Sequence, residues 1–487
     1  MSESSPKPAW LALWVALAAC CVMPGSDSLW IDEGSTAIFA MQPSLHDWWA
    51  TLQSWIDSEK QMPFGMFFAW LFAKAFGTSE LALRMANLPW AFAAVLAFAR
   101  IGRRLSLGWL PLALVVQPFF WAYMNEARPY VMQIASGAWL LFALIECGHH
   151  RGLNAREWAP HAAISSVVLC AASMLGAMMC AAAVLVLAVM FAMWRRGPER
   201  RAILWFAGAA LLLAPIGLYY VWTLKGGAGG AKNWNVGISN VFFAIYEFLG
   251  FSGLGPGRAD LRDIARAGSL GTTLKSYAIP FGILAVCYVI AAIGFIRSRR
   301  SEPALGISAG VLALGFAMLY VAAVVVGFPF WGRHLAPAFP CAAVIVALLV
   351  RRQPVVASVM ACVLAYSGLS LRFSERHGHD DYRAACAFTS SQSGSQIWWV
   401  ASDRPARYYE LPITDDPAQS PAVLAIQLYL GGGPDRSLNS LSAPSWIVIS
   451  KPDLYDRSHA VTRYVAEHNY QIAKEFRAFC IYAKALP

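Results

Sequence analysis

Long apolar stretches recur along this chain from its N-terminal region to about residue 371. A run of about 20 apolar residues can cross the hydrocarbon core of a bilayer as one helix. Charged residues make up 14% of the chain, whereas a soluble domain has about 25%. We therefore predict a polytopic α-helical membrane protein with about eleven spans, at residues 9–24, 80–99, 107–122, 131–147, 159–176, 177–194 (after a turn at Gly176), 202–222, 277–296, 304–326, 335–350 and 354–371.

Arginines gather in every second short loop between these stretches. They are Arg100, Arg103, Arg104, Arg151, Arg156, Arg195, Arg196, Arg200, Arg201, Arg297, Arg299, Arg300, Arg351 and Arg352. Short basic loops stay in the cytoplasm, so the N-terminus is predicted to be cytoplasmic. The loops at 123–130, 223–275 and 327–334, together with Asp32 and the C-terminal tail, then lie outside. Membrane orientation thus explains the net charge of +10, and nucleic acid is not expected as a partner.

The first outer loop, residues 25–79, is predicted to carry helices of its own. Within 45–56, apolar side chains fall on one helical face and polar ones on the other, a pattern typical of a helix that lies in the plane of the membrane interface. The apolar segment 63–76 is too short to cross a bilayer. We expect it to lie along the outer surface.

After residue 371 the composition changes, because polar residues increase and long apolar runs stop. Asp380 and Asp381 indicate a helix start. Short apolar runs predict strands, and stretches between them predict helices: strands at Ile397–Ser402, Trp446–Ser450 and Phe479–Lys484, and helices at 403–410 and 458–468. The chain is therefore predicted to have a membrane domain at 1–371 and a small α/β domain outside the membrane at 372–487.

Ten cysteines occur, without a CxxC pair or a Cys/His cluster with zinc spacing. No metal site is predicted, although a divalent metal is not excluded. Only Cys386 and Cys480 fall in the predicted α/β domain. In an oxidising compartment they could form a disulfide, and the alternative is two buried free thiols.

Asp32 and Glu33 follow directly after the first apolar stretch. Acids are costly near hydrocarbon, so a pair at a membrane boundary indicates a functional site. The alternative is that both acids cap an interfacial helix. Other polar residues on the predicted outer side are candidates for the same site, each with a plainer reading as a helix start, a solvated lysine or an interfacial side chain: Lys60, Glu126, Arg128, Arg333 and His334.

Several short segments resemble the GT-C class of membrane glycosyltransferases, in particular the bacterial branch related to protein O-mannosyltransferases and lipid A aminoarabinose transferases. They are Trp30-Ile31-Asp32-Glu33, Met62-Pro63-Phe64, Phe76-Gly77-Thr78-Ser79-Glu80 with Ala82-Leu83-Arg84, Asn125-Glu126-Ala127-Arg128-Pro129-Tyr130, Arg333-His334-Leu335-Ala336-Pro337 and Asp381-Tyr382-Arg383. The topology is similar over most of the chain. Met62 stands where the family has a proline, and His334 where it has a tyrosine.

The resemblance implies a GT-C fold in the bacterial inner membrane, with the C-terminal domain in the periplasm. It implies an inverting transfer of sugar from a polyprenyl-phosphate donor to a lipid, glycan or protein acceptor, amid membrane lipids and without a cofactor. Asp32 would be the base, with Glu33 orienting it or binding the acceptor. Residues at the other segments would bind substrate: Lys60, Glu126, Arg128, Tyr130, Arg333 and His334.

Two other classes of membrane protein remain as alternatives. A lipid or glycan transporter would be expected to have charges or broken helices at mid-span and repeat symmetry, whereas the acids here gather in outer loops. A polymer ligase would be expected to carry a histidine-centred signature in its outer loops, and none is evident. The residues do not specify the sugar, the acceptor or the oligomeric state.

Overall fold

The computed structural model describes the chain except for residues 1–6, 196, 226–235, 258–274, 299–301, 393, 419–422, 432–436 and 485–487. Contacts divide the chain into two compact units. The helical unit comprises Met1–Gly25, Pro43–Gly77 and Ala82–Gly378. The α/β unit comprises Ser26–Gln42, Thr78–Leu81 and His379–Pro487.

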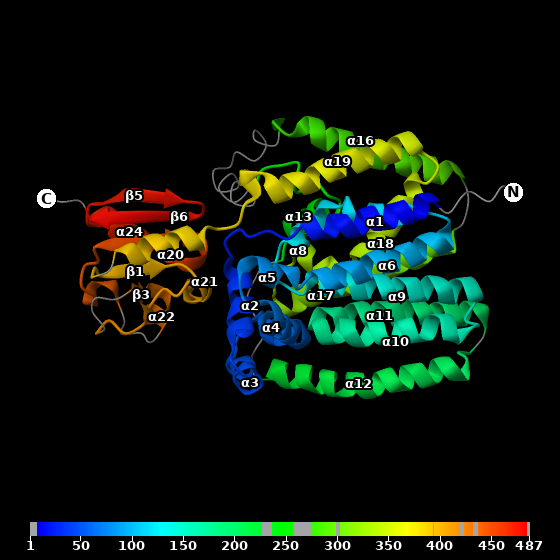
Figure 1. The fold of residues 1–487 in the computed structure, drawn as a ribbon, viewed down its shortest axis with the longest axis horizontal. Helices are drawn as coiled ribbons and strands as arrows, with labels where there is room; N and C mark the ends of the chain where they lie inside the picture. Colours follow the sequence, from blue (N-terminus) through cyan, green and yellow to red (C-terminus); the bar gives the residue numbers. More distant parts are fainter. Residues whose placement is uncertain are drawn as a thin grey trace. The chain divides into compact units, whose positions relative to one another are not determined.

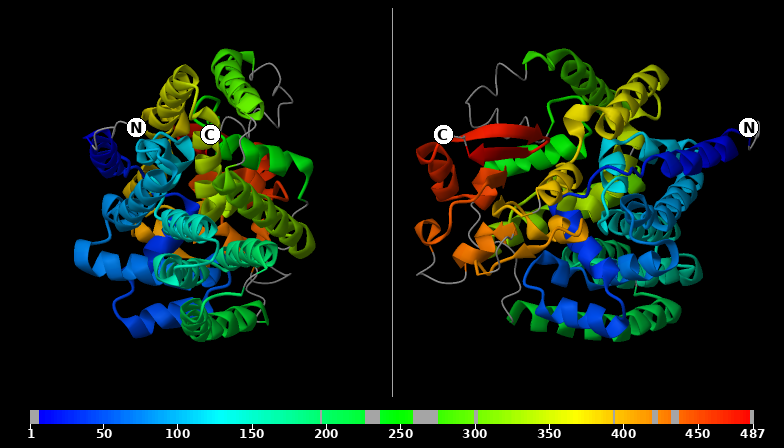
Figure 2. Two further views of the ribbon diagram at one scale, coloured as in Figure 1. Left: turned by 90° about the vertical axis from the view of Figure 1, so that its right-hand side faces the viewer. Right: turned by 60° about the vertical axis from the view of Figure 1, so that its left-hand side comes forward.

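Long helices that run side by side form most of the helical unit, as Figure 1 and the two further views in Figure 2 show. They are α1 (Lys7–Val22), α6 (Leu88–Leu105), α9 (Tyr130–His150), α10 (Ala155–Ala172), α11 (Met174–Trp194), α12 (Arg200–Lys225), α16 (Ala278–Ser298), α17 (Pro303–Val326), α18 (Phe339–Val350) and α19 (Pro354–Phe373). Among the described residues, 8 helices are long and apolar enough to cross a membrane. The predicted polytopic class is confirmed, and the count of about eleven spans is not.

Two details of the predicted spans are wrong. Residues 107–122 form two short helices, α7 (Leu110–Val115) and α8 (Pro118–Met124). Pro118 lacks an amide hydrogen and disfavours a helical Gln117, which is extended with φ −75° and ψ 123°. The turn expected at Gly176 lies at Ser173, whose Oγ accepts a hydrogen bond of 3.2 Å from the Leu175 amide and so caps α11.

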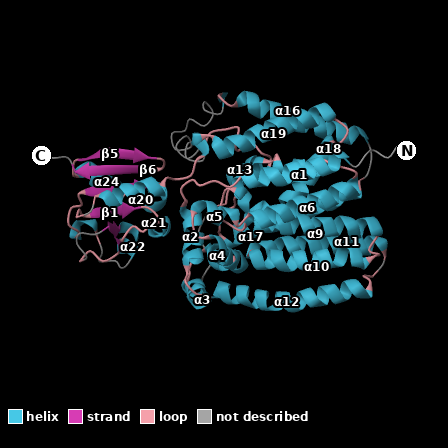
Figure 3. Cartoon of the chain, viewed as in Figure 1, coloured by secondary structure: helices cyan, strands magenta, loops and turns pink. Residues whose placement is uncertain are grey.

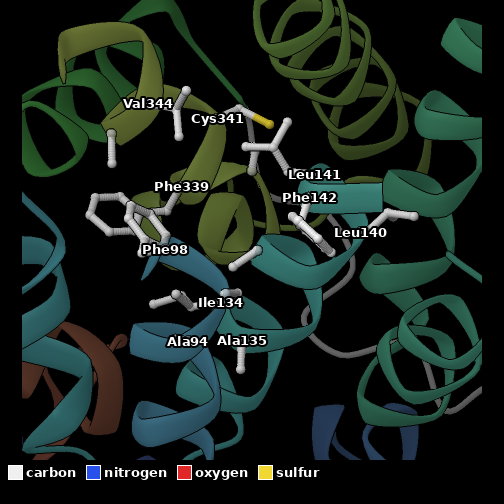
Figure 4. Close-up of a cluster of buried hydrophobic side chains, with 14 of the residues drawn as sticks. Ala94, Phe98, Ile134, Ala135, Leu140, Leu141, Phe142, Phe339, Cys341 and Val344 are labelled. Carbon is white, nitrogen blue, oxygen red and sulfur yellow. The ribbon is translucent and has the colours of Figure 1, made fainter. Parts of the chain in front are cut away.

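The core of the helical unit is built around α9. In this helix, 89% of the most apolar stretch of 18 residues is buried. Figure 4 shows the region where α6, α9 and α18 contribute side chains such as Phe98, Ile134 and Phe339 to one cluster. The short helix η2 (Gly332–Ala338) comes close to α9 at Gly137, where an added Cβ would lie 2.2 Å from the Pro337 carbonyl oxygen. Glycine therefore permits the contact that places η2, the element that carries Arg333 and His334.

Residues 25–79, the predicted first outer loop, contain the helices that the sequence predicts. They are α3 (Leu45–Ser54) and α4 (Pro63–Phe76), with the short helix η1 (Ser58–Gln61) between them. Ser44 caps α3 by accepting a hydrogen bond of 3.1 Å from the Asp47 amide. On the apolar face of α3, Trp48 and Leu52 are buried and Leu45 and Trp49 are exposed. Whether the exposed part enters a membrane interface stays a prediction.

All the described strands lie in the α/β unit, where Figure 3 draws them in magenta. They are β1 (Ile397–Val400), β2 (Ile413–Thr414), β3 (Val423–Ala425), β4 (Trp446–Ser450), β5 (Tyr470–Phe476) and β6 (Phe479–Lys484), in one sheet of order β2-β3-β1-β4-β6-β5. Strands β2, β3, β1 and β4 are parallel, and β6 pairs antiparallel with β4 and β5. Separate apolar clusters cover its two faces.

Helices of the α/β unit complete this small domain and confirm its predicted class. They are α2 (Ile31–Met41), α20 (Tyr382–Ser391), α21 (Asp403–Tyr408), α22 (Ile426–Gly431), α23 (Pro452–Tyr455) and α24 (Ala460–Glu467). Asp381 caps α20 as predicted, since its Oδ1 accepts a hydrogen bond of 3.0 Å from the Ala384 amide. The domain division at 371/372 stays a prediction. By contacts, the helical unit ends at Gly378, and α2 belongs to the same unit as the C-terminal residues.

Cys386 and Cys480 do not form the disulfide considered for them. Cys386 packs in the cluster that contains Phe479 and Ile481. Successive side chains of a strand point to opposite faces, so Cys480 points away from that cluster. Burial raises the pKa of the Cys386 thiol to about 12, which leaves it protonated and unreactive.

The predicted orientation can be tested with single cysteines at exposed serines. In a background without Cys21 and Cys362, which are exposed, Ser239→Cys at the start of α13 (Ile238–Phe248) should react with an impermeant maleimide added to whole cells. Ser106→Cys after α6 should react only once the membrane is opened. The reverse pattern would overturn the orientation derived from the arginine loops.

Candidate active site

The predicted acid pair occupies the first turn of α2. Trp30 is the N-cap residue, and its amide donates a hydrogen bond of 3.4 Å to Glu33 Oε2. Glu33 therefore caps its own helix, as the structural alternative proposed. Glu33 is fully buried, whereas Asp32 is partly exposed. Of the two carboxylates, Asp32 is the one that solvent can reach.

Side chains from the C-terminal part of the α/β unit surround the start of α2. His379 Nδ1 lies 3.4 Å from Glu33 Oε2, and the His379 ring contacts the Trp30 ring at 6.2 Å between centroids. Lys451 Nζ lies 5.8 Å from the Trp30 ring centroid and forms an ion pair with Asp380. Asp380 was expected to cap a helix together with Asp381. Asp381 alone is the N-cap of α20, and the Asp380 carboxylate pairs with Lys451 instead.

The segment just before α2 is held by Tyr409 and Glu80, which belong to the same unit. The Tyr409 hydroxyl accepts a hydrogen bond of 2.9 Å from the Leu29 amide and lies 3.2 Å from Glu80 Oε1. Arg383 Nη2 in turn donates to Glu80 Oε1 at 2.7 Å. Burial raises the pKa of Tyr409, so it remains a neutral hydroxyl. This network fixes the chain immediately ahead of the acid pair.

Arg128 and Glu59 form a buried ion pair in the helical unit. Arg128 Nη1 donates to Glu59 Oε1 at 2.7 Å, and each side chain is 2% exposed. Glu59 Oε2 also accepts a hydrogen bond of 2.8 Å from Trp55 Nε1. Arg128 is therefore not an interfacial arginine in contact with lipid. Glu59 is not among the residues predicted for the site, although it is adjacent to Lys60.

Lys60 is buried beside this pair on η1. Its ammonium donates to the Gln53 carbonyl oxygen at 2.8 Å and lies 4.7 Å from the centre of the Trp222 ring. The Tyr219 hydroxyl donates to the Lys60 carbonyl oxygen at 2.7 Å. Lys60 is thus not a solvated loop lysine. The cation–π contact ties η1 to α12.

The segment 125–130 is buried and held by polar contacts. Asn87 Nδ2 donates to the Glu126 carbonyl oxygen at 2.7 Å, and Asn125 Oδ1 accepts a hydrogen bond of 2.7 Å from the Gly25 amide. Arg84, itself fully buried, donates to the Gly25 carbonyl oxygen at 3.0 Å. Tyr130 begins α9, and its ring packs on the Tyr123 ring. The structure thus brings Glu126, Arg128 and Tyr130 onto one rigid connection.

Arg333 and His334 lie on η2 and are partly exposed. Buried Glu247 accepts a hydrogen bond of 3.1 Å from the Gly332 amide, which places a negative charge beside the start of η2. His334 Nδ1 accepts a hydrogen bond of 3.3 Å from the Trp331 amide, and its ring contacts Phe328. His334 therefore helps to hold the start of η2, and Arg333 beside it is partly exposed.

Two other features of the helical unit lie apart from the predicted site residues. A groove of about 520 Å³ between α10 and α12 is lined by apolar side chains such as Ile164 and Leu204, with Arg201 at its edge. Glu146, His150 and Glu157 have ligand atoms within 4.8 Å of one another. Arg104 donates to both Glu146 oxygens, so this cluster is an ion-pair network rather than a prepared metal site.

Comparison with solved structures identifies the architecture. ArnT from Cupriavidus metallidurans bound to undecaprenyl phosphate has a TM-score of 0.51 with this chain, at 15% identity over 99% of each chain. The chain has the GT-C fold. The fold class predicted from the sequence, with a small C-terminal α/β domain, is thereby confirmed.

Two further structures are similar with lower scores. Arabinofuranosyltransferase AftD from Mycobacteria is 16% identical, and the match covers 100% of this chain and 40% of AftD with a TM-score of 0.47. The Archaeoglobus fulgidus oligosaccharyltransferase is 12% identical, and the match covers 97% of this chain and 73% of the oligosaccharyltransferase chain with a TM-score of 0.48. No family model and no curated protein matches the sequence.

The Arg128–Glu59 pair predicts a measurable effect on stability. Arg128→Met leaves the Glu59 charge buried without its partner, which should lower the free energy of unfolding by about 3–5 kcal/mol. The double variant Glu59→Gln with Arg128→Met removes both charges and should recover much of that loss. Thermal-unfolding midpoints in detergent measure both effects.

The matched control is Arg351→Met. Arg351 pairs with Glu302 at 3.1 Å, and the two side chains are 35% and 33% exposed. A solvent-exposed ion pair contributes about 1 kcal/mol or less to stability. The thermal-unfolding midpoint of Arg351→Met should therefore stay close to that of the wild type. Equal midpoints for Arg128→Met and Arg351→Met would contradict the importance of burial.

Proposed function

We propose that the protein is an inverting glycosyltransferase that moves a sugar from a polyprenyl-phosphate donor to a lipid, glycan or protein acceptor. The observation that carries the proposal is the partly exposed Asp32 on α2, next to the buried Glu33, in a chain that shares its fold over 99% of its length with ArnT bound to undecaprenyl phosphate. The site is proposed to face the periplasmic side of a bacterial inner membrane, because the arginine loops orient the acid pair outward.

The proposed reaction needs a base more than an acid. The acceptor oxygen or nitrogen forms a bond to the anomeric carbon, and the bond from that carbon to the phosphate oxygen breaks. The bonding electron pair leaves with the phosphate, and the acceptor proton passes to the Asp32 carboxylate. Attack from the side opposite the phosphate inverts the anomeric carbon. Glu33, which is buried and caps α2, is proposed to hold Asp32 in place.

The leaving phosphate requires fixed positive charge. Arg333 is the strongest candidate, because it is partly exposed on η2. Arg128 and Lys60 are both buried, and their side chains contact Glu59 and the Trp222 ring respectively. Arg128 and Lys60 are therefore proposed to shape the donor site together with Glu126 and Tyr130, and Arg333 to bind the phosphate.

Asp32→Asn should abolish sugar transfer while the protein still folds, because the amide keeps the shape of the side chain and cannot accept the proton. The assay is transfer or hydrolysis of a polyprenyl-phosphate sugar by purified protein in detergent, with the thermal-unfolding midpoint as the measure of folding. The matched control is Asp27→Asn, at an exposed carboxylate five positions earlier in the same segment. Turnover by Asp32→Asn at the wild-type rate would refute the assignment.

Arg333→Gln should weaken use of the donor. A charge-assisted contact contributes about 1.5–3 kcal/mol, which corresponds to a loss of roughly 10- to 150-fold in kcat/KM for the donor. The acceptor KM should change little. Arg351→Gln, at a predicted cytoplasmic loop, is the control and should leave both parameters unchanged. An unchanged donor kcat/KM in Arg333→Gln would show that Arg333 has no part in phosphate binding.

A further inference from the structure

Within the α/β unit, α2 and α21 come into close backbone contact. An added Cβ at Gly34 would lie 2.6 Å from the backbone nitrogen of Pro405, so a glycine is required where the two helices meet. Ser402 caps α21, and its Oγ accepts a hydrogen bond of 3.4 Å from the Arg404 amide. The start of α21 is thus fixed against the helix that carries the acid pair.

This contact places the Arg404 guanidinium on the same face of α2 as Asp32. Arg404 Nη1 donates to Ser35 Oγ at 2.9 Å. Ser35 follows Asp32 by three positions, and residues with that spacing are neighbours on a helix surface. The charges of Arg404 and Asp32 attract each other. The hydrogen bond from Arg404 to Ser35 therefore holds the guanidinium near Asp32, the proposed base.

Tyr455, at the end of α23, lies in the same group of polar side chains. Its hydroxyl interacts with Ser402 and Tyr382, and it senses the charges of Asp380 and Asp32. Burial raises the pKa of Tyr455 above its ordinary value, so the hydroxyl stays neutral and can donate a hydrogen bond. Tyr455 therefore adds a neutral donor near the acid that Arg404 faces.

The other charged groups around the start of α2 already have partners in this unit. Glu33 lies beside His379, and Asp380 pairs with Lys451. Burial lowers the pKa of Arg404, while Tyr455 and Asp32 act in the opposite direction; an arginine nevertheless remains protonated. Arg404 thus supplies Asp32 with a permanent positive charge at every pH at which the protein is folded.

We propose that Arg404 and Tyr455 are positioning residues of the α/β unit that keep the Asp32 carboxylate ionised and aimed for proton abstraction. The inference rests on the proposed function and extends it. The C-terminal residues would belong to the catalytic apparatus and would not form a separate binding module. A nearby cation lowers the pKa of a carboxylate, so Arg404 would extend activity to lower pH.

The test is the pH dependence of kcat/KM for Arg404→Gln, Arg404→Lys and Tyr455→Phe, with a polyprenyl-phosphate sugar as donor. Without the cation Asp32 should take up its proton at higher pH, so the acidic limb of the profile should move up by about one unit or more in Arg404→Gln. The rate below the new limb should fall roughly tenfold or more. Arg404→Lys should return the limb towards its wild-type position, and Tyr455→Phe should lower the rate at every pH.

Two controls separate positioning from a general effect on folding. Arg407→Gln, on the same helix but exposed and paired with Asp403 at 3.1 Å, should keep the wild-type profile. The double variant Asp32→Asn with Arg404→Gln should be no less active than Asp32→Asn alone, because residues that act through one another are not additive.

The outcomes distinguish this inference from the proposed function. A wild-type pH profile in Arg404→Gln would overturn the role of Arg404. So would a loss of activity in Arg404→Gln that comes without a shift of the acidic limb and that Arg404→Lys does not restore. In either case an inactive Asp32→Asn would still support the transferase. Full activity in Asp32→Asn would overturn both. If Arg404→Gln fails to fold, the test uses the position of the acidic limb in Arg404→Lys and the rate of Tyr455→Phe. Wild-type values of both would refute the inference.

Discussion

The close contact between α2 and α21 is the constraint on which the candidate acid site depends. It is possible because Gly34 has no side chain where Pro405 approaches, and the Arg404–Ser35 hydrogen bond adds direction to it. The same unit places His379, Lys451 and Tyr455 around the start of α2. A larger residue at position 34 would collide with Pro405 and push α2 and α21 apart.

The membrane part of the fold followed from sequence because the length of an apolar run is a direct physical requirement of the bilayer. Where the prediction failed, the cause was local, as at Pro118, which interrupts an otherwise apolar run. In the α/β unit, β1, β4 and β6 are apolar enough to recognise. Strands β2 and β3 have two and three residues, and β5 is largely exposed, so none of them carries a clear pattern.

The acid pair could be singled out in the sequence because two adjacent acids beside a long apolar stretch are unusual. The side chains that surround the pair could not be found in this way. Arg404, Lys451 and His379 lie far along the chain in a segment of ordinary composition, and charged residues there would normally be read as solvated surface. The same limit applies to Arg128. Its charge was visible in the sequence, but the field it produces depends on Glu59, and only the three-dimensional structure brings those two side chains together.

The assignment of α2 to the α/β unit has a consequence for biosynthesis. Ser35 and its hydrogen-bond partner Arg404 are separated by 369 positions, so α2 leaves the ribosome long before the residues that bury it. At about 5–20 residues per second, roughly 20 to 70 s of synthesis separate the two. Throughout that interval the nascent chain must keep Glu33, later fully buried, in a provisional environment. The contact between Arg404 and Ser35 can therefore form only late in synthesis or after it.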